Sequence, residues 1–251
     1  MGLQNWQIEF FKTIERHRKQ GFGWRYDGLE SWTNETIFSK LHELKVDTDA
    51  ERFAQQARAA GRIKVLDDDW NRQITENNND PGFWQDFPLL ALPLLWERLA
   101  SDVSCPEVIE QRLYKVLDAE DKGLLLADVG GVPAVVVAAL EFAKYLQGFG
   151  VSERAARFED VKSIGYYDYD EWLLDLVETY GPTYPDEITQ IADVMSDCTS
   201  ADRYQSELAL ALAVAGRREV AVRRAIANTA RFPDDAWVKI TAGDVFGLDR
   251  A

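Results

Sequence analysis

Apolar residues recur at helical spacing along almost the whole chain, and this periodicity is the feature that most constrains the fold. Residues three or four positions apart share one face of a helix, whereas a half-buried strand alternates apolar and polar side chains. No long segment of the sequence shows that alternation. The pattern predicts about a dozen helices, over residues 6–19, 34–44, 49–61, 65–74, 83–99, 105–117, 133–146, 169–180, 185–195, 201–215, 219–230 and 235–246, and a short one that begins at Ser152. Short helices with short connections predict an all-α fold of stacked helical hairpins.

Two capping boxes mark expected helix starts. In this motif a Ser or Thr side chain accepts a hydrogen bond from the backbone three residues later, and a Glu at that later position reaches back. Thr48 with Glu51 predicts one such start, and Ser104 with Glu107 predicts another.

The clearest interruption of the helical pattern is the segment Asn77–Gly82, which is rich in Asn and ends in Asp-Pro-Gly. These residues favour turns and end helices. The segment predicts an N-terminal helical region over residues 1–80 and a helical-hairpin region over 81–251, unless the two form one continuous domain. The helix that follows contains Pro88 and Pro93, which should shorten or kink it because proline lacks the amide donor.

The acidity of the chain excludes several classes of function. The 251 residues include 28 Lys and Arg against 43 Asp and Glu, which gives a formal net charge of −15. Nucleic acids and anionic lipids attract basic surfaces, so we expect neither direct nucleic-acid binding nor membrane docking. Hydrophobic residues make up 46% of the chain, which argues against wholesale disorder.

The sequence shows no sign of export. The N-terminus lacks the basic and apolar pattern of a signal peptide, and the longest apolar runs fall short of the ~20 residues that a membrane span needs. We therefore expect a cytoplasmic protein. Cys105 and Cys198 are the only cysteines, too few for a disulfide framework, and we expect two buried free thiols.

The C-terminal part of the chain matches the helix and turn positions of a known repeat. The matching positions are Leu208 in a first helix, Gly216 at a turn, Ala221 in a second helix, Pro233 at its end, and Gly243 and Phe246 in a third helix. This stretch, about residues 202–251, resembles a degenerate tetratricopeptide repeat, which is a helix–turn–helix unit of about 34 residues. A plain helical hairpin is the alternative interpretation.

The match to this repeat is incomplete. Gln205 replaces the usual Trp, Ala209 the usual Gly, and Ala225 the usual large aromatic residue. The resemblance implies protein–protein contact on a concave surface. Residues 92–123 are faintly similar to uncharacterised bacterial helical proteins, some of which end in a Cys-rich metal motif. No cysteine follows Cys198 here, so that metal motif is absent.

Few residues are candidates for catalysis or metal binding. His42 lies beside Glu43, and the pair could transfer a proton, but no nucleophile or metal motif accompanies it. The run Asp67–Asp69 could hold Mg²⁺ or Ca²⁺, although three consecutive carboxylates on a helix point in three directions. The pair Gly130-Gly131 lacks the other residues of a phosphate-binding loop. We therefore expect no catalytic residue, no metal and no cofactor.

Negative charge is concentrated between residues 161 and 202. This 42-residue stretch holds ten acids and one base, a net charge of −9, with tyrosines and a tryptophan among the acids. Acids mixed with exposed aromatic residues suit a surface that binds a basic protein. The expected partner-binding residues are Asp168, Asp170, Glu171, Asp175, Tyr167 and Tyr169. We expect this acidic segment to be the main partner-binding surface, and not the arginine-rich terminal hairpin with Arg217, Arg218, Arg223 and Arg224.

These observations leave three functions open. The first is a non-enzymatic interaction or adaptor protein that binds another, basic protein through the acidic surface. The second is an acidic inhibitor or immunity-type protein that neutralises a basic, nucleic-acid-binding partner. The third is an enzyme of unrecognised type that uses Glu43 with His42, or the run Asp67–Asp69. The oligomeric state cannot be read from the sequence.

Overall fold

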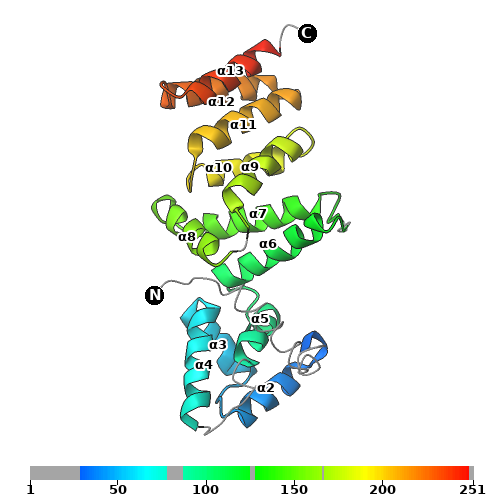
Figure 1. Cartoon of the computed structure of the whole chain (residues 1–251), viewed down its shortest axis with the longest axis vertical. Coiled ribbons are helices and arrows are strands. Elements are labelled where there is room, and N and C mark those ends of the chain that lie inside the picture. Colours follow the sequence, from blue (N-terminus) through cyan, green and yellow to red (C-terminus); the bar gives the residue numbers. More distant parts are fainter. Residues whose placement is uncertain (1–28, 78–86, 125–127, 166, 249–251) are drawn as a thin grey trace. The chain divides into compact units, whose positions relative to one another are not determined.

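A computed structural model describes residues 29–77, 87–124, 128–165 and 167–248 (Figure 1). Within these ranges the chain forms twelve α-helices, one short 3-10 helix and no strand beyond an isolated bridge between Val129 and Val132. The prediction of an all-α fold is therefore confirmed. The helix expected at residues 6–19 lies outside the described residues.

The chain divides into two compact units, and the first comprises Met1–Gln111 with Ser163–Tyr166. Its helices are η2 (Leu29–Ser31), α2 (Asn34–Glu43), α3 (Ala50–Ala60), α4 (Ile63–Asn77), α5 (Phe87–Leu99) and the first turns of α6 (Pro106–Asp121). Aromatic side chains from three of these helices form the centre of the core. The ring of Phe53 lies 5.9 Å from that of Trp70 and 6.2 Å from that of Trp96, and all three are fully buried.

This first unit ends at Gln111, later than the boundary near residue 80 that the sequence suggests. The reason is that α5 completes the core of the preceding helices. Phe87, Leu90 and Leu95 of α5 are buried in the same hydrophobic cluster as the side chains of α2, α3 and α4. The helix also continues through Pro93, and Pro88 occupies its first turn, where a missing amide donor costs little.

Both capping boxes differ from their prediction. The N-cap of α3 is Asp49, whose carboxylate accepts from the backbone N–H of Arg52 at 2.9 Å. The side chain of Thr48 is buried and donates instead to Gln56 at 3.1 Å. α6 begins at Pro106, and Glu107 is buried beside Arg62, with the guanidinium and carboxylate 3.5 Å apart. Tertiary packing therefore recruits both predicted capping partners into the core.

The second unit comprises Arg112–Lys162 with Tyr167–Ala251. Besides the rest of α6, its helices are α7 (Ala134–Gln147), α8 (Val151–Ile164), α9 (Tyr169–Tyr180), α10 (Pro185–Met195), α11 (Ala201–Val214), α12 (Arg218–Arg231) and α13 (Ala236–Gly247). The β-branched run Val135–Val137 is helical, as predicted, and α8 is longer than expected. The rings of Phe142 and Phe158 stack in the core, 5.7 Å apart.

The last five helices of this unit, which follow one another along the stack in Figure 1, begin at nearly constant intervals in the sequence. α9, α11 and α13 begin at residues 169, 201 and 236, so their starts are 32 and 35 residues apart. α10 and α12 begin at residues 185 and 218, which are 33 residues apart. α11 packs against both α9 and α13, and also against α10 and α12. The regular pattern extends one hairpin further upstream than the sequence match.

Two glycines make this arrangement possible. Gly216, at the turn between α11 and α12, has a φ of 78°, which favours glycine because it has no Cβ. At Gly181, at the end of α9, an added Cβ would lie only 2.5 Å from the Cβ of Ala211 in α11. The first glycine is at a predicted turn, whereas the second reflects a close helix approach that the sequence did not indicate.

The interior of the last hairpin is partly polar. Leu208 and Ala221 are buried, as the repeat positions require, but Gly243 faces open space and Phe246 is 44% exposed. Ala242 and Val245 fill the interior in their place, because α13 turns these residues toward α11 and α12. Where the repeat usually has a large aromatic residue, Ala225 leaves room for buried polar side chains. The Asn228 amide donates to Ser206 at 2.9 Å and to the Asp202 carbonyl at 2.8 Å.

Candidate partner-binding surface

The six residues expected to bind a partner do not lie on one surface. Tyr169 is fully buried, with its ring 6.4 Å from that of Phe142, so the expectation that it is exposed is wrong. The helical register of α9 turns it toward α7. Asp168 is the N-cap of α9 and accepts from the backbone N–H groups of Asp170 and Glu171 at 3.2 and 3.4 Å. The carboxylate of Asp170 pairs with Lys162 of α8. These three residues stabilise the fold.

The remaining acids of α9 form an exposed face. Two predicted residues, Glu171 and Asp175, and one unpredicted residue, Glu178, are exposed and spaced four and three residues apart. That spacing places them on the same side of a helix. Within the described part of the chain, none of the three has an ion-pair partner. We call these three residues the α9 acidic face.

The surface continues onto α11 and α13 through one carboxylate. Glu207 of α11 accepts a hydrogen bond from the indole N–H of Trp237 in α13 at 3.1 Å, and Trp237 is 47% exposed. Partial burial raises the pKa of Glu207, and the charge of Glu178 raises it further, whereas Trp237 and Arg203 act in the opposite direction. Glu178, Glu207 and Trp237 are therefore neighbours on three helices.

Tyr167 belongs to a different group of side chains. Its hydroxyl donates to Asp121 at the end of α6 at 3.0 Å, and its ring lies 5.8 Å from that of Tyr114. Partial burial and this hydrogen bond raise the pKa of Tyr167. The contact with Asp121 leaves no local signal in the sequence, because Asp121 lies 46 residues before Tyr167 and outside the acidic segment.

The acidic segment and the arginine cluster are not separate surfaces. The guanidinium of Arg217 contacts Asp186 of α10 at 2.8 Å, and that of Arg224 contacts both oxygens of Asp193 at 2.6 and 2.9 Å. The Arg217 hydrogen bond lowers the pKa of Asp186. For Asp193, burial opposes the shift, but hydrogen bonds from Arg224 and Gln205 outweigh it and lower the pKa. Cations of the terminal hairpin thus neutralise part of the segment.

The candidate catalytic pair does not assemble. The Nε2 atom of His42 lies 2.6 Å from the carbonyl oxygen of Thr48, and the carboxylate of Glu43 pairs with Lys40 at 2.7 Å. His42 thereby connects the end of α2 to the loop before α3. This geometry counts against a proton-transfer role for the pair.

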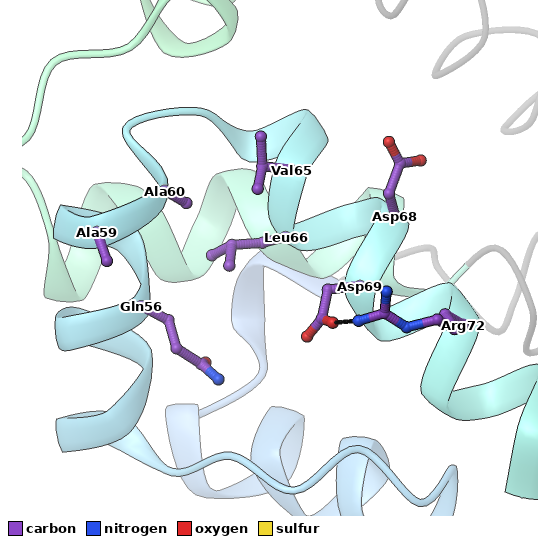
Figure 2. Close-up of a pocket in the computed structure, with 8 residues that line it drawn as sticks. All are labelled: Gln56, Ala59, Ala60, Val65, Leu66, Asp68, Asp69 and Arg72. Atoms are coloured by element: carbon purple, nitrogen blue, oxygen red, sulfur yellow. Dashed lines mark hydrogen bonds and ion pairs between the residues drawn. The ribbon is translucent and has the colours of Figure 1, made fainter.

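The carboxylates of Asp67–Asp69 point apart. Asp67 is buried and accepts from Asn71, while Asp68 pairs with Lys64 and Asp69 with Arg72. Figure 2 shows the side chains of Asp68 and Asp69 directed to opposite sides of α4. Three groups that each have their own partner cannot surround one cation, and no cluster of His, Cys, Asp and Glu suited to a metal occurs among the described residues.

An open groove of about 470 Å³ lies between α3 and α4 (Figure 2). Its lining combines small and apolar side chains with polar ones, which are Gln56, Ala59, Ala60, Val65, Leu66, Asp68, Asp69 and Arg72. The charges in it are already paired within α4. The groove therefore offers neither converging reactive groups nor unbalanced charge.

Both cysteines are free thiols, as predicted. Cys105 is fully buried, and burial raises its pKa. Cys198 is only partly buried, and burial with the nearby charge of Asp197 raises its pKa to about 12. Neither thiol has the low pKa of a nucleophile. Among the described helices, none combines the length and the apolar character needed to span a membrane.

The sequence matches no protein-family model, no curated protein and no solved structure. The function must therefore be argued from the residues of this chain.

Proposed function

We propose that this chain is a non-enzymatic interaction protein that binds a basic partner protein through the α9 acidic face. The observation that carries the proposal is that Glu171, Asp175 and Glu178 are exposed without a cation to pair with in the described part of the chain. By contrast, Asp186 and Asp193 of α10 are paired. Uncompensated like charge destabilises the folded state through repulsion. A basic partner would relieve that repulsion.

Two further features support the proposal. The exposed ring of Trp237, beside Glu207, supplies apolar area next to the acids, and tryptophan is enriched at binding hot spots. The near-constant interval between α9, α11 and α13 agrees with the tetratricopeptide-like character inferred from the sequence, which implies protein contact. We therefore extend the repeat-like region upstream to α9 as part of the proposal.

The test compares two triple variants of equal net charge. One carries Glu171→Lys, Asp175→Lys and Glu178→Lys on the α9 acidic face. The control carries Glu51→Lys, Glu76→Lys and Glu153→Lys, three exposed glutamates on other helices. Each wild-type or variant protein, tagged, is used to capture partners from its native host, and the association rate of the captured partner is then measured against salt.

We expect the α9 variant to lose a basic partner that the control retains. The association rate at low salt should fall about tenfold or more, since complementary charge acts mainly on the rate of encounter. Circular dichroism should show the same helical content in both variants. Equal loss in the two variants, or a rate that does not change with salt, would contradict the proposal.

A second candidate function is an acidic inhibitor or immunity-type protein. The net charge of −15 favours it, because such a protein must neutralise a strongly basic surface. The two functions differ in what the captured partner does. A nuclease or other nucleic-acid-binding partner that loses its activity when the wild-type chain is added would favour the inhibitor, and a partner that stays active would favour the adaptor.

A further inference from the structure

Four tyrosines lie around the two ends of α9, close to the acidic end of α6. Tyr167 precedes α9 and lies beside Tyr114 of α6, with the ring centres 5.8 Å apart. Tyr180 ends α9 and lies 6.4 Å from Tyr184. All four rings are partly exposed. The second unit contains all of them.

Carboxylates at the end of α6 lie near one tyrosine of each pair, Tyr167 and Tyr180. Asp121 accepts the hydrogen bond of Tyr167, and Asp118, one turn earlier, pairs with Lys122 at 2.6 Å. Glu120 lies close enough to Tyr180 for its charge to act on the hydroxyl: partial burial raises the pKa of Tyr180, and the charge of Glu120 raises it further. Burial and the neighbouring Asp121 also raise the pKa of Glu120.

Aromatic faces beside carboxylates have a specific chemical preference. A ring face attracts a cation, and among side chains the planar guanidinium of arginine both stacks on aromatic rings and forms forked hydrogen bonds with carboxylates. Lysine presents a compact, strongly hydrated charge and gains less from a ring. A surface that alternates tyrosine and carboxylate therefore discriminates between two cations of equal charge, which an acidic face alone cannot do.

We propose that Tyr114, Tyr167 and Tyr180, together with Asp118, Glu120 and Asp121, form a tyrosine–acid surface that binds arginine side chains of the partner protein. This inference rests on the proposed function and deepens it. The α9 acidic face attracts a basic partner without regard to which base it carries, and the tyrosine–acid surface selects arginine. Lys122 is the internal cation that an arginine would displace from Asp118.

The test uses fluorescein-labelled peptides of nine arginines and of nine lysines, which carry equal charge, with binding measured by fluorescence anisotropy at low salt. We expect the wild-type chain to bind the arginine peptide about fivefold more tightly, since each exposed cation–ring contact contributes about two- to fivefold. Tyr167→Leu with Tyr180→Leu should remove this preference. Phe246→Leu, which removes an exposed ring elsewhere, is the matched control and should leave the preference unchanged.

Two further variants separate the ring from its hydrogen bond and from the general charge. Tyr167→Phe keeps the ring and loses the hydrogen bond to Asp121, so the arginine preference should remain. This variant tests the role of the ring independently of how well the leucine variants fold. The triple lysine variant of the α9 acidic face should weaken both peptides alike and preserve their ratio. Equal binding of the two peptides by the wild-type chain, or an unchanged ratio in the leucine double variant, would overturn the tyrosine–acid surface alone. If the wild-type chain bound neither the arginine peptide nor the lysine peptide, the proposed function would be overturned as well.

Discussion

The helices α9 and α10 form one hairpin inside the same acidic segment, yet their carboxylates have opposite surroundings. On α10, Asp186 and Asp193 each contact an arginine that lies 31 residues later: Arg217, the N-cap of α12, and Arg224 on α12. On α9, the acidic face has no such cation among the residues that the structure describes, and the neighbour that α11 places beside Glu178 is another acid, Glu207. The difference shows that whether an acidic residue is paired with a cation depends on the helices of the next hairpin, and not on its neighbours in sequence.

The largest expected effect on stability comes from disturbing the close packing of α9 against α11. Gly181→Ala should lower the free energy of unfolding by about 1–3 kcal/mol, because the new methyl group would lie 2.5 Å from Ala211 and the helices would have to separate. Urea denaturation followed by circular dichroism measures the change. Adding Ala211→Gly should recover part of the loss. An unchanged stability of the single variant would show that α9 and α11 do not approach so closely.

Reversing one arginine tests the paired side of the comparison. Arg224→Glu should lower the free energy of unfolding by about 1–2 kcal/mol, because it breaks the two bonds to Asp193 and puts two like charges together. Exchanging the pair, Asp193→Arg with Arg224→Glu, should restore more than half of the loss. Glu178→Lys on the α9 acidic face should change stability by no more than about 0.5 kcal/mol. A similar loss at Glu178 would erase the distinction between the two helices.

The smallest expected effect concerns pH and Glu207. The pKa of Glu207 in the folded state is raised above its ordinary value of 4.5. The contribution of Glu207 to stability is therefore complete below pH 4.5, and it is lost as the pH rises through the raised folded-state pKa. Glu207→Gln, which keeps an acceptor for Trp237, should therefore make the folded protein slightly more stable at pH 7 and leave it unchanged near pH 4. Asp193, with a lowered pKa, behaves oppositely and loses its contribution only as the pH falls below 3.8. Unfolding curves measured from pH 4 to 8 test this prediction. A Glu207→Gln variant that is less stable than the wild type at neutral pH would contradict the raised pKa of Glu207.

The helices were readable from the sequence because their signals are local. Apolar spacing gave Tyr169–Tyr180 and Pro185–Met195 with the bounds that the structure shows. The turn at Gly216 was also readable, since its backbone conformation favours glycine. Where local signals compete with packing, prediction failed: Thr48 was expected to cap α3, but it is buried and Asp49 caps the helix.

The candidate site was only partly readable for a related reason. A charge pattern identifies which residues are acidic, but not which have a cation beside them. Asp170 and Asp193 look equivalent to Glu171 and Asp175 in the sequence, yet the first two are paired across helices. The partner of Tyr167 is also distant in sequence. Such contacts depend on how helices pack, and a single sequence contains no local signal for them.

The two ion pairs that α10 forms with Arg217, the N-cap of α12, and with Arg224 on α12 affect how the helices align, although each contributes little energy. Asp186 and Asp193 lie seven residues apart on α10, and their partners Arg217 and Arg224 are also seven residues apart. Each acid is therefore 31 residues from its arginine. The buried residues of α12 are Ala221, Ala225 and Asn228, so apart from the hydrogen bonds of Asn228 its buried surface offers little to distinguish one helix position from another. If α12 slid by one turn against α11, on which it packs, both ion pairs with α10 would break together. Polar contacts of this kind select one arrangement among several that apolar packing alone would tolerate.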